Sequence, residues 1–360
     1  MDRRKFLTTA GVAGAATVAA PAIVNAKKTI KWKMTTAFPP GQPFYSTGPG
    51  TSTDFAKRVK EMSDGRLDIK VHHAGELVPA FEGFDAVRQG VVQCNSWVSY
   101  FGAGKIPAAQ FFGAVPFGMS TQGQNAWFYS GDGIKLWHEV YEPYGLVAFP
   151  LGATGVQMTG WFNKEIKSVE DMKGLRLRIP GLAGKAYARI GVEVKVLPGG
   201  EIFPALERDV IDAAEWVGPA QDKILGLNKA AKYYYTTGWH EPTTVTELTI
   251  NKGAWEALPD DLKAIVQNAA AACNVIGHSW AEANNAAALK EFIAGGTEVR
   301  TLPADVVKAL KKEMGPVYDE LAAKDPMFKK VMENYFAFKK EHDFWANASE
   351  KVWHSELRDA

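Results

Sequence analysis

Two stretches between residues 168 and 216 decide the fold: SVEDMKGLRLRIPG at 168–181 and GVEVKVLPGGEIFPALERDVIDAAEW at 191–216. Ser168, with Asp171 three residues later, is typical of a capped helix start. LRLRI at 175–179 alternates polar and apolar side chains, which predicts a strand, and VEVKVLP at 192–198 predicts another. A helix is predicted between these strands at 185–190, and a further helix at 203–213. This alternation of strands and helices indicates an α/β fold.

The same alternation continues on both sides of this region. Strands are predicted at 29–35, 66–71, 91–98 and 244–251, and helices at 53–65 and 81–89. Residues 145–163 predict one long extended stretch with polar positions inserted. From Trp255 onward the pattern is almost entirely helical, apart from a short strand near 298–302. We therefore expect an α/β domain with a mainly parallel sheet.

The length of 360 residues suits two domains or one large one, and no Pro/Ser-rich linker divides the chain. If two domains are present, the chain crosses between them more than once, near 150 and near 240. That organisation places a cleft between two lobes. Because α/β folds bind ligands at the carboxyl ends of their strands, we expect the functional site in this cleft.

The composition excludes several classes of protein. The chain has 41 Lys and Arg residues and 40 Asp and Glu residues, so it has no excess of basic residues for binding a phosphate backbone. We therefore expect no nucleic-acid partner. The two cysteines, Cys94 and Cys273, cannot build a disulfide framework or a Cys-rich metal site. Both lie in apolar settings, which predicts buried thiols, although a Cys94–Cys273 disulfide stays open.

The first 26 residues have the layout of an export signal. Arg3, Arg4 and Lys5 precede an Ala/Gly/Val-rich run, and Val24-Asn25-Ala26 offers an A-x-A-like cleavage site. The twin arginine predicts export to the periplasm by the Tat route, with cleavage of residues 1–26. An N-terminal membrane anchor is the alternative, but the run is too weakly apolar for one. This segment holds three of the basic and one of the acidic residues, so the remaining chain has a formal charge of −1.

Motifs of the common enzyme classes are missing. The sequence contains no G-x-S-x-G, no H-E-x-x-H, no P-loop and no C-x-x-C. A scattered Ser/His/Asp triad is not excluded by a sequence alone. We predict that the protein is not an enzyme.

Polar residues set among apolar ones point to a binding site. These are Gln157, Arg178, Glu215 and Glu241, with Trp216 and Trp239 beside two of them as apolar walls. A buried arginine is costly without an anion, and a guanidinium matches a carboxylate in geometry and charge. The side-chain oxygens of Gln157 and Glu215 are of the kind that binds Na⁺ or Ca²⁺. Each residue taken alone could equally be a structural residue that is satisfied locally.

At these residues the chain resembles the substrate-binding subunits of tripartite ATP-independent periplasmic (TRAP) transporters, the dicarboxylate-binding-protein family. The resemblance covers essentially all of 29–325, and its most specific part is the pattern quoted first. It implies a two-lobed periplasmic binding protein, type II-like, with a ligand cleft between the lobes. We expect 27–150 plus about 242–280 as lobe I, 151–241 plus about 281–324 as lobe II, and a long C-terminal helix at 325–360. Arg178 matches the arginine that clamps the substrate carboxylate in this family.

Three segments resemble the branch that binds 2-oxo and 2-hydroxy monocarboxylates through a metal ion: GVQMTGWF, EWVGP and the tail FKKVMENYFAFKKEHDFW. The resemblance implies metal contacts at Gln157, Glu215, Trp216 (through its backbone carbonyl) and Glu241. The segment around Glu241, WHEPTT, departs from the Gly-rich pattern of the branch. The expected substrate contacts are Arg178, Gln157, Trp216 and Trp239, the aromatic pair Tyr100 and Phe101, and Phe38 on the opposite wall.

The last helix carries a heptad stripe. Val331, Phe338, Trp345 and Val352 recur every seven residues, beside a second row of Phe328, Tyr335 and His342. Such a stripe needs a partner surface, which is either the same chain or a second copy. The resemblance favours a homodimer through this helix, because the branch dimerises through a long terminal helix.

The sequence thus predicts a periplasmic receptor that delivers a small 2-oxo or 2-hydroxy monocarboxylate, pyruvate- or lactate-like, to the TRAP membrane permease. The expected cofactor is a bound cation, calcium or sodium. The alternatives are a metal-free binder of dicarboxylates or sugar acids, a Tat-exported enzyme that uses Glu215 and Glu241 as a carboxylate pair, and a structural envelope protein.

Overall fold

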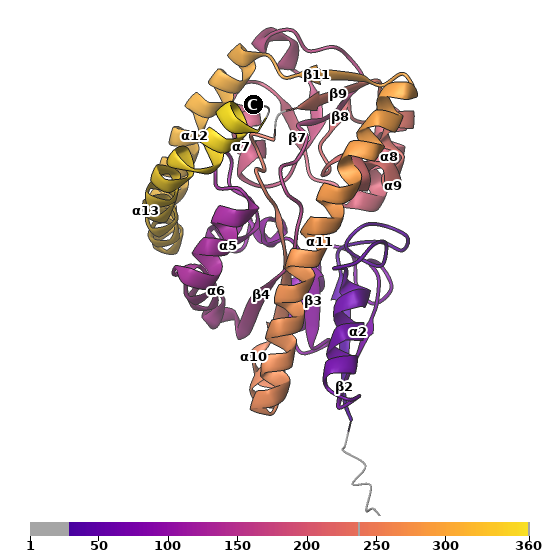
Figure 1. The fold of residues 1–360 in the computed structure, drawn as a ribbon, viewed down its shortest axis with the longest axis vertical. Helices are drawn as coiled ribbons and strands as arrows, with labels where there is room; N and C mark the ends of the chain where they lie inside the picture. The colour runs from indigo at the N-terminus through magenta and orange to yellow at the C-terminus, as the bar shows by residue number, and fades with distance from the viewer. Residues whose placement is uncertain (1–28, 237, 359–360) are drawn as a thin grey trace, which may run out of the picture.

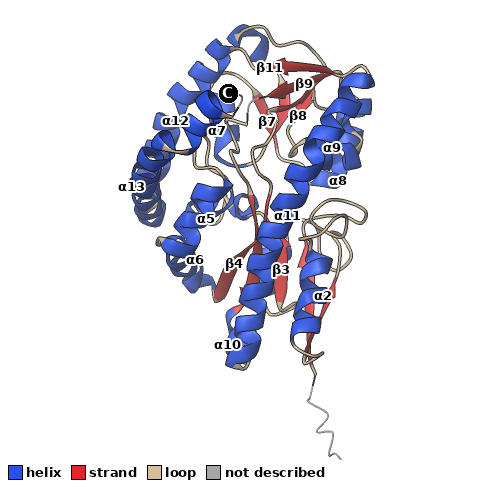
Figure 2. Cartoon of the chain, viewed as in Figure 1, coloured by secondary structure: helices blue, strands red, loops and turns tan. Residues whose placement is uncertain are grey.

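A computed structural model describes residues 29–236 and 238–358 and shows two α/β lobes (Figures 1 and 2). The predicted export signal at 1–26 lies outside the described residues. Lobe I, the lower lobe in Figure 1, is built on a five-stranded sheet, and lobe II on a six-stranded sheet. The expected two-lobed α/β fold is confirmed. In the part of the chain that the structure describes, no helix is both long and apolar enough to span a bilayer.

Each sheet is mainly parallel, as predicted, and contains one reversed strand. The sheet of lobe I has the order β2-β1-β3-β10-β4 and the sheet of lobe II the order β11-β9-β5-β8-β6-β7. The reversed strands are β10 and β5, each antiparallel to both of its neighbours. The strands of lobe I are β1 Ile30–Thr36, β2 Leu67–Val71, β3 Cys94–Trp97, β4 Leu146–Ala153 and β10 Val245–Asn251. Those of lobe II are β5 Gly160–Phe162, β6 Arg176–Arg178, β7 Glu193–Lys195, β8 Ala213–Ala214, β9 Tyr233–Thr236 and β11 Glu298–Thr301.

Helices cover both sheets, and one of them joins the lobes. α11 (Asp260–Ala294) runs along both lobes in Figure 1 and contacts β4 and α2 of lobe I and α9 of lobe II. Lobe I carries α2 Ser52–Met62, α3 Gly83–Arg88, α4 Gln110–Gly113, α5 Thr121–Ser130, α6 Gly133–Tyr141 and α10 Lys252–Glu256. Lobe II carries α7 Gly181–Arg189, α8 Gly199–Glu207 and α9 Pro219–Leu225. α12 Ala304–Lys324 contacts α7 of lobe II, whereas α13 Pro326–Ala348 contacts α4, α5 and α6 of lobe I and is followed by α14 Glu350–Val352. Short 3₁₀ turns lie at Ser99–Gly102, Pro107–Ala109, Glu142–Tyr144, Val169–Met172 and Leu227–Lys229, and a π turn at Trp353–Leu357.

The structure corrects two predicted elements. The predicted helix at 203–213 ends at Glu207, because Asp209 adopts a left-handed φ of 53° and its carboxylate accepts a hydrogen bond from Asn163 Nδ2 at 3.0 Å. Residues 213–214 then form β8 instead. The single extended stretch predicted at 145–163 is two strands, β4 and β5, in different lobes. The capping box of Ser168 and Asp171 is present, although it starts a 3₁₀ turn and not an α-helix.

Three clusters of buried apolar side chains hold the lobes and their contact together. One lies in lobe I between its sheet and helices α2 and α11, and it includes Cys94 and Cys273, which are buried free thiols as predicted. The largest joins lobe II to α5, α6, α12 and α13. The third contains side chains of both lobes, among them Phe38 from lobe I and Trp216 from lobe II. The lobes are therefore packed against each other in this structure.

Candidate ligand-binding site

Two connecting segments lie side by side where the chain passes between the lobes. Residues 154–159 lie between β4 and β5, and residues 238–244 precede β10. Thr154 N donates to Thr244 O at 3.0 Å and Gln157 N to Glu241 O at 3.2 Å. At Gly238 a Cβ would lie 2.3 Å from the Gln157 carbonyl oxygen, so this close approach requires glycine. Gln157 thus lies in a connecting segment, and the prediction that it interrupts a strand was wrong.

Arg178 and Glu215 are brought together by the register of lobe II. β6 and β8 are parallel neighbours with Arg178 opposite Ala214, so Arg178 at the end of β6 meets Glu215, the residue after β8. Arg178 Nη1 donates to Glu215 Oε2 at 2.8 Å and to Glu215 O at 3.0 Å, and Nε donates to Leu197 O at 3.1 Å. Arg178 is 1% exposed and Glu215 is fully buried. These bonds hold the guanidinium in one orientation, and Nη2 carries its remaining two N–H donors.

A small cavity of about 20 Å³, room for roughly one water molecule, lies between the lobes beside Arg178. Six predicted residues line it: Phe38, Tyr100, Phe101, Gln157, Arg178 and Trp216. The Arg178 guanidinium lies 5.6 Å from the centre of the Trp216 ring, and the Tyr100 and Phe101 rings pack edge to face at 4.9 Å. The cavity therefore combines one buried cation with aromatic walls.

The two carboxylates predicted as metal ligands are buried and electrostatically linked. Burial raises the pKa of Glu215 well above its ordinary value against the opposing effect of Arg178, and nearby Glu241 raises it further. Burial also raises the pKa of Glu241 to about 7, although the Thr244 hydroxyl donates to its Oε2. Gln157 Nε2 in turn donates to Thr244 Oγ1 at 2.9 Å. Gln157, Thr244 and Glu241 thus form one hydrogen-bonded chain along the connecting segments.

Two buried oxygens beside this chain lack hydrogen-bond partners among the described residues: Gln157 Oε1 and Glu215 Oε1. Leaving a buried acceptor without a partner costs about 1–3 kcal/mol, and a cation would remove that cost. The described residues contain no group of three or more His, Cys, Asp or Glu side chains that could hold a metal. Amide, carboxylate and carbonyl oxygens instead form the kind of donor set that suits Na⁺ or Ca²⁺. The residues present therefore fit a hard cation.

Trp239 lies elsewhere. Its ring packs on Phe117 and Tyr187, with ring centres 5.2 Å apart in both cases, in the cluster that joins lobe II to α12 and α13. It is not among the residues that line the cavity. In this structure Trp239, a predicted substrate contact, therefore lies apart from the other predicted site residues.

Sequence reasoning missed half of the cavity wall: Phe44, Val98, Thr154, Val217, Thr244 and Thr246. Thr154 directly follows β4, and Thr244 and Thr246 lie at the start of β10. This position at strand ends could have identified them. It also missed His240, whose two ring nitrogens are buried without partners in the described chain. Burial and the nearby Arg178 lower the pKa of His240 to about 3, so the ring is neutral.

Comparison with known proteins identifies relatives along most of the chain. The family described as "Bacterial extracellular solute-binding protein, family 7" matches residues 43–325. A monocarboxylate 2-oxoacid-binding periplasmic protein of Nostoc sp. is 43% identical over 97% of this chain and 97% of its own length.

Two crystal structures of TRAP periplasmic solute-binding proteins share the fold. One, from Pseudoalteromonas atlantica with bound sodium and pyruvate, is 38% identical, with a TM-score of 0.87 over 91% of this chain and 99% of that one. The other, from Colwellia psychrerythraea with bound calcium and pyruvate, is 39% identical, with a TM-score of 0.86 over the same shares. The chain therefore belongs to family 7 of the bacterial extracellular solute-binding proteins and is a TRAP transporter solute-binding protein.

Proposed function

We propose that this protein captures a small 2-oxo or 2-hydroxy monocarboxylate, pyruvate- or lactate-like, together with a bound cation, and delivers it to a TRAP permease. The observation that carries the proposal is that Arg178 and Gln157 line one small cavity, with Glu215 paired to Arg178, and that Gln157 and Glu215 each have an unpartnered side-chain oxygen among the described residues. The ligands named for the Nostoc, Pseudoalteromonas and Colwellia proteins support the same chemistry.

Arg178 is the residue that binds the carboxylate. Its Nε and Nη1 are held by Leu197 O and Glu215, so the guanidinium is oriented before a ligand arrives. Preorientation lowers the entropy lost on binding. Trp216, Tyr100 and Phe101 surround the site with rings that exclude water and strengthen the charge–charge attraction.

A cation would be held by the side-chain oxygens of Gln157, Glu215 and Glu241 and by the backbone carbonyl of Trp216. When bound, it supplies positive charge for the carboxylate and the 2-oxygen of the acid. With Ca²⁺ the charges balance: Arg178 and the ion are positive, and the two glutamates and the acid carry the same amount of negative charge. With Na⁺ they balance when Glu241 carries a proton. This site is therefore compatible with either ion.

Ligand exchange requires the lobes to separate. A cavity of about 20 Å³ has no route for an organic acid while Phe38 of lobe I packs in the same cluster as Trp216 of lobe II. The connecting segments 154–159 and 238–244 are the hinge in this proposal. A ligand that contacts both lobes stabilises the closed form, and its release accompanies reopening.

Thermal-shift screening of the purified protein against organic acids, with and without Ca²⁺, tests this function. We expect 2-oxo and 2-hydroxy monocarboxylates to raise the melting temperature, and to do so more with the cation. Stabilisation by dicarboxylates or sugar acids that is unaffected by EDTA would favour the metal-free alternative. Chemical turnover of the bound acid would favour the enzyme that uses Glu215 and Glu241.

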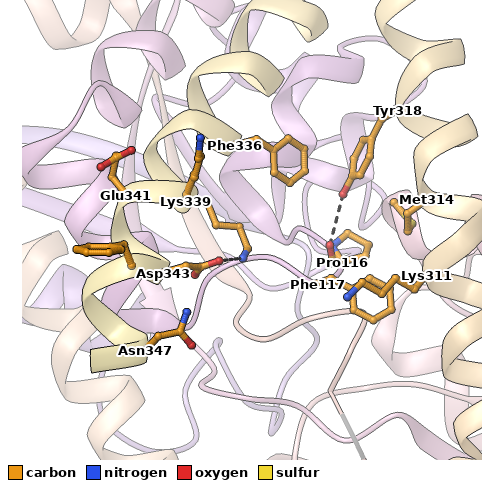
Figure 3. A pocket seen from close by; sticks show the side chains of 12 residues that line it. Pro116, Phe117, Lys311, Met314, Tyr318, Phe336, Lys339, Glu341, Asp343 and Asn347 are labelled. Atoms are coloured by element: carbon orange, nitrogen blue, oxygen red, sulfur yellow. Dashed lines mark hydrogen bonds and ion pairs between the residues drawn. The ribbon is translucent and has the colours of Figure 1, made fainter. Parts of the chain in front are cut away.

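We also propose a homodimer through the C-terminal helix. The first half of the heptad stripe covers the same chain, since Phe328, Val331 and Tyr335 are fully buried against it. Beyond residue 343 the stripe is open, with Phe344 80% and Trp345 66% exposed. Beside this end, α12, α13 and the segment around Phe117 enclose a groove of about 680 Å³ (Figure 3). The exposed rings and the groove offer a self-complementary surface to a second copy.

Two variants test the dimer. Replacing both Phe344 and Trp345 by Glu should give the monomer mass in size-exclusion chromatography with light scattering. Replacing Lys351 and Glu350 by Ala on the same helical end is the matched control and should leave a dimer. A wild-type chain that is monomeric at tens of micromolar would refute this part of the proposal.

We further propose Tat export with cleavage after Ala26. Replacement of Arg3 and Arg4 by Lys should abolish this export.

A further inference from the structure

The loop that precedes α2 holds an aromatic residue in a strained conformation. Phe44 has a φ of 68°, in the left-handed region that bulky side chains avoid. Its carbonyl oxygen accepts two hydrogen bonds from Ser52, from the backbone N–H at 2.9 Å and from the hydroxyl at 2.9 Å. The loop is thereby tied to the first turn of α2. Strain of this kind persists where surrounding contacts enforce it, and it is concentrated at functional sites.

The ring of Phe44 stands between two small cavities. One is the central cavity beside Arg178, where the Phe44 ring lies 5.1 Å from the ring of Phe38. The other, also about 20 Å³, is enclosed by the loop, β4 and α11. Among the described residues that line either cavity, Phe44 alone lines both. Phe44 is therefore part of the wall of both cavities.

The second cavity lies directly behind the first and is mostly apolar. Thr246 lines the central cavity and is paired with Gly152, which lines the second one. A Cβ at Gly152 would lie 2.6 Å from Thr246 Oγ1, so these two lining residues are in close contact. Pro43, Ala153 and Trp280 supply apolar surface in the second cavity. Such surface suits an alkyl chain.

We propose that Phe44 sets the longest alkyl chain that the site accepts. Its ring ends the space on this side of the central cavity, so it limits how far the alkyl chain of a bound acid extends past Phe38. Without the ring, the two cavities become one, and the chain of a longer 2-oxo acid extends toward Trp280. The proposal rests on the proposed function, because it concerns the same substrate class at the same site.

Titration calorimetry with a series of straight-chain 2-oxo acids, from pyruvate to 2-oxohexanoate in the presence of Ca²⁺, tests the proposal. The variant is Phe44→Gly, because glycine adopts a positive φ without strain. The ratio of the 2-oxohexanoate and pyruvate affinities should rise by at least about ten-fold over wild type, since one methylene in an apolar pocket is worth about 10–200-fold. Phe44→Leu, which keeps an apolar core contact, should shift the ratio by an intermediate amount.

Thr47 provides the matched control, because it lines the second cavity and not the central one. Thr47→Phe alone should leave the affinity ratio at the wild-type value, and Thr47→Phe added to Phe44→Gly should cancel the gain. The proposal is overturned if the folded Phe44 variants keep the wild-type ratio, or if they lose every acid alike. If wild type binds no 2-oxo acid, the proposed function itself fails, which is a different outcome.

Discussion

At the scale of single residues, the proposed function depends most on Arg178. Arg178→Ala should abolish binding of carboxylates in titration calorimetry. It should also lower the free energy of unfolding by about 3–5 kcal/mol, because Glu215 then remains as a buried charge without its cation. Arg178→Lys keeps the charge but loses the planar fork, so a folded protein with at least about ten-fold weaker binding is expected.

Arg176 is the control for Arg178, because it lies on the same strand and does not line the cavity. Its guanidinium pairs with Asp212 at 2.6 Å in a half-exposed position. Arg176→Ala should leave the affinity unchanged. Unchanged affinity in Arg178→Ala would remove Arg178 from the site.

A second residue-scale prediction concerns Glu247 in lobe I, which does not line the cavity. Burial raises its pKa to about 7, although Tyr141 donates to its Oε2 at 2.9 Å. Because the folded pKa lies above the unfolded one, this group stabilises the fold at low pH, and that contribution is lost as the pH rises from about 4.5 through 7. Relative to Glu247→Gln, wild type should lose up to about 3 kcal/mol of unfolding free energy between pH 5 and 8. Urea titrations at both values of pH measure this, and equal slopes for the two proteins would contradict it.

At the scale of elements, the two connecting segments position the site. Gly238→Ala places a Cβ against the Gln157 carbonyl, so the segments must separate. We expect a loss of about 1–3 kcal/mol in stability and weaker acid binding, because Gln157 moves away from Glu215. Gly104→Ala, where a Cβ meets nothing within 4 Å, is the control. Melting temperatures and calorimetric affinities that match between the two variants would show that the segments do not hold Gln157 in place.

The same elements show what a sequence can and cannot predict. Arg178 and Glu215 were identified because charged residues in apolar stretches leave a local signal, and Ser168 because capping uses fixed spacing. The end of α8 was missed because Val210 and Ile211 fit a helix and a strand equally well, and only the left-handed Asp209 separates the two. Phe44 was missed, and the position of Trp239 outside the cavity lining was not foreseen, because the position of a ring relative to a cavity depends on contacts between distant segments, which leave no periodic pattern in the sequence.

At the scale of the whole molecule, capture of an anion cannot depend on net charge. The full chain has a formal charge of +1, and residues 27–360 carry −1. In the proposed function the attraction comes from local groups, namely the Arg178 guanidinium and a cation held between the lobes. α11, which contacts both lobes, and the two connecting segments then transmit the binding of one small acid to the relative position of the lobes.

The most direct measurement is titration of pyruvate into protein stripped with EDTA and then supplied with Ca²⁺, Na⁺ or neither. We predict binding of one acid per chain that is at least about ten-fold tighter with a cation than without one, and none in Arg178→Ala. Equal affinity with and without cations would contradict the role of Gln157 and Glu215. No binding of pyruvate, lactate or any related acid under any of these conditions would contradict the central claim.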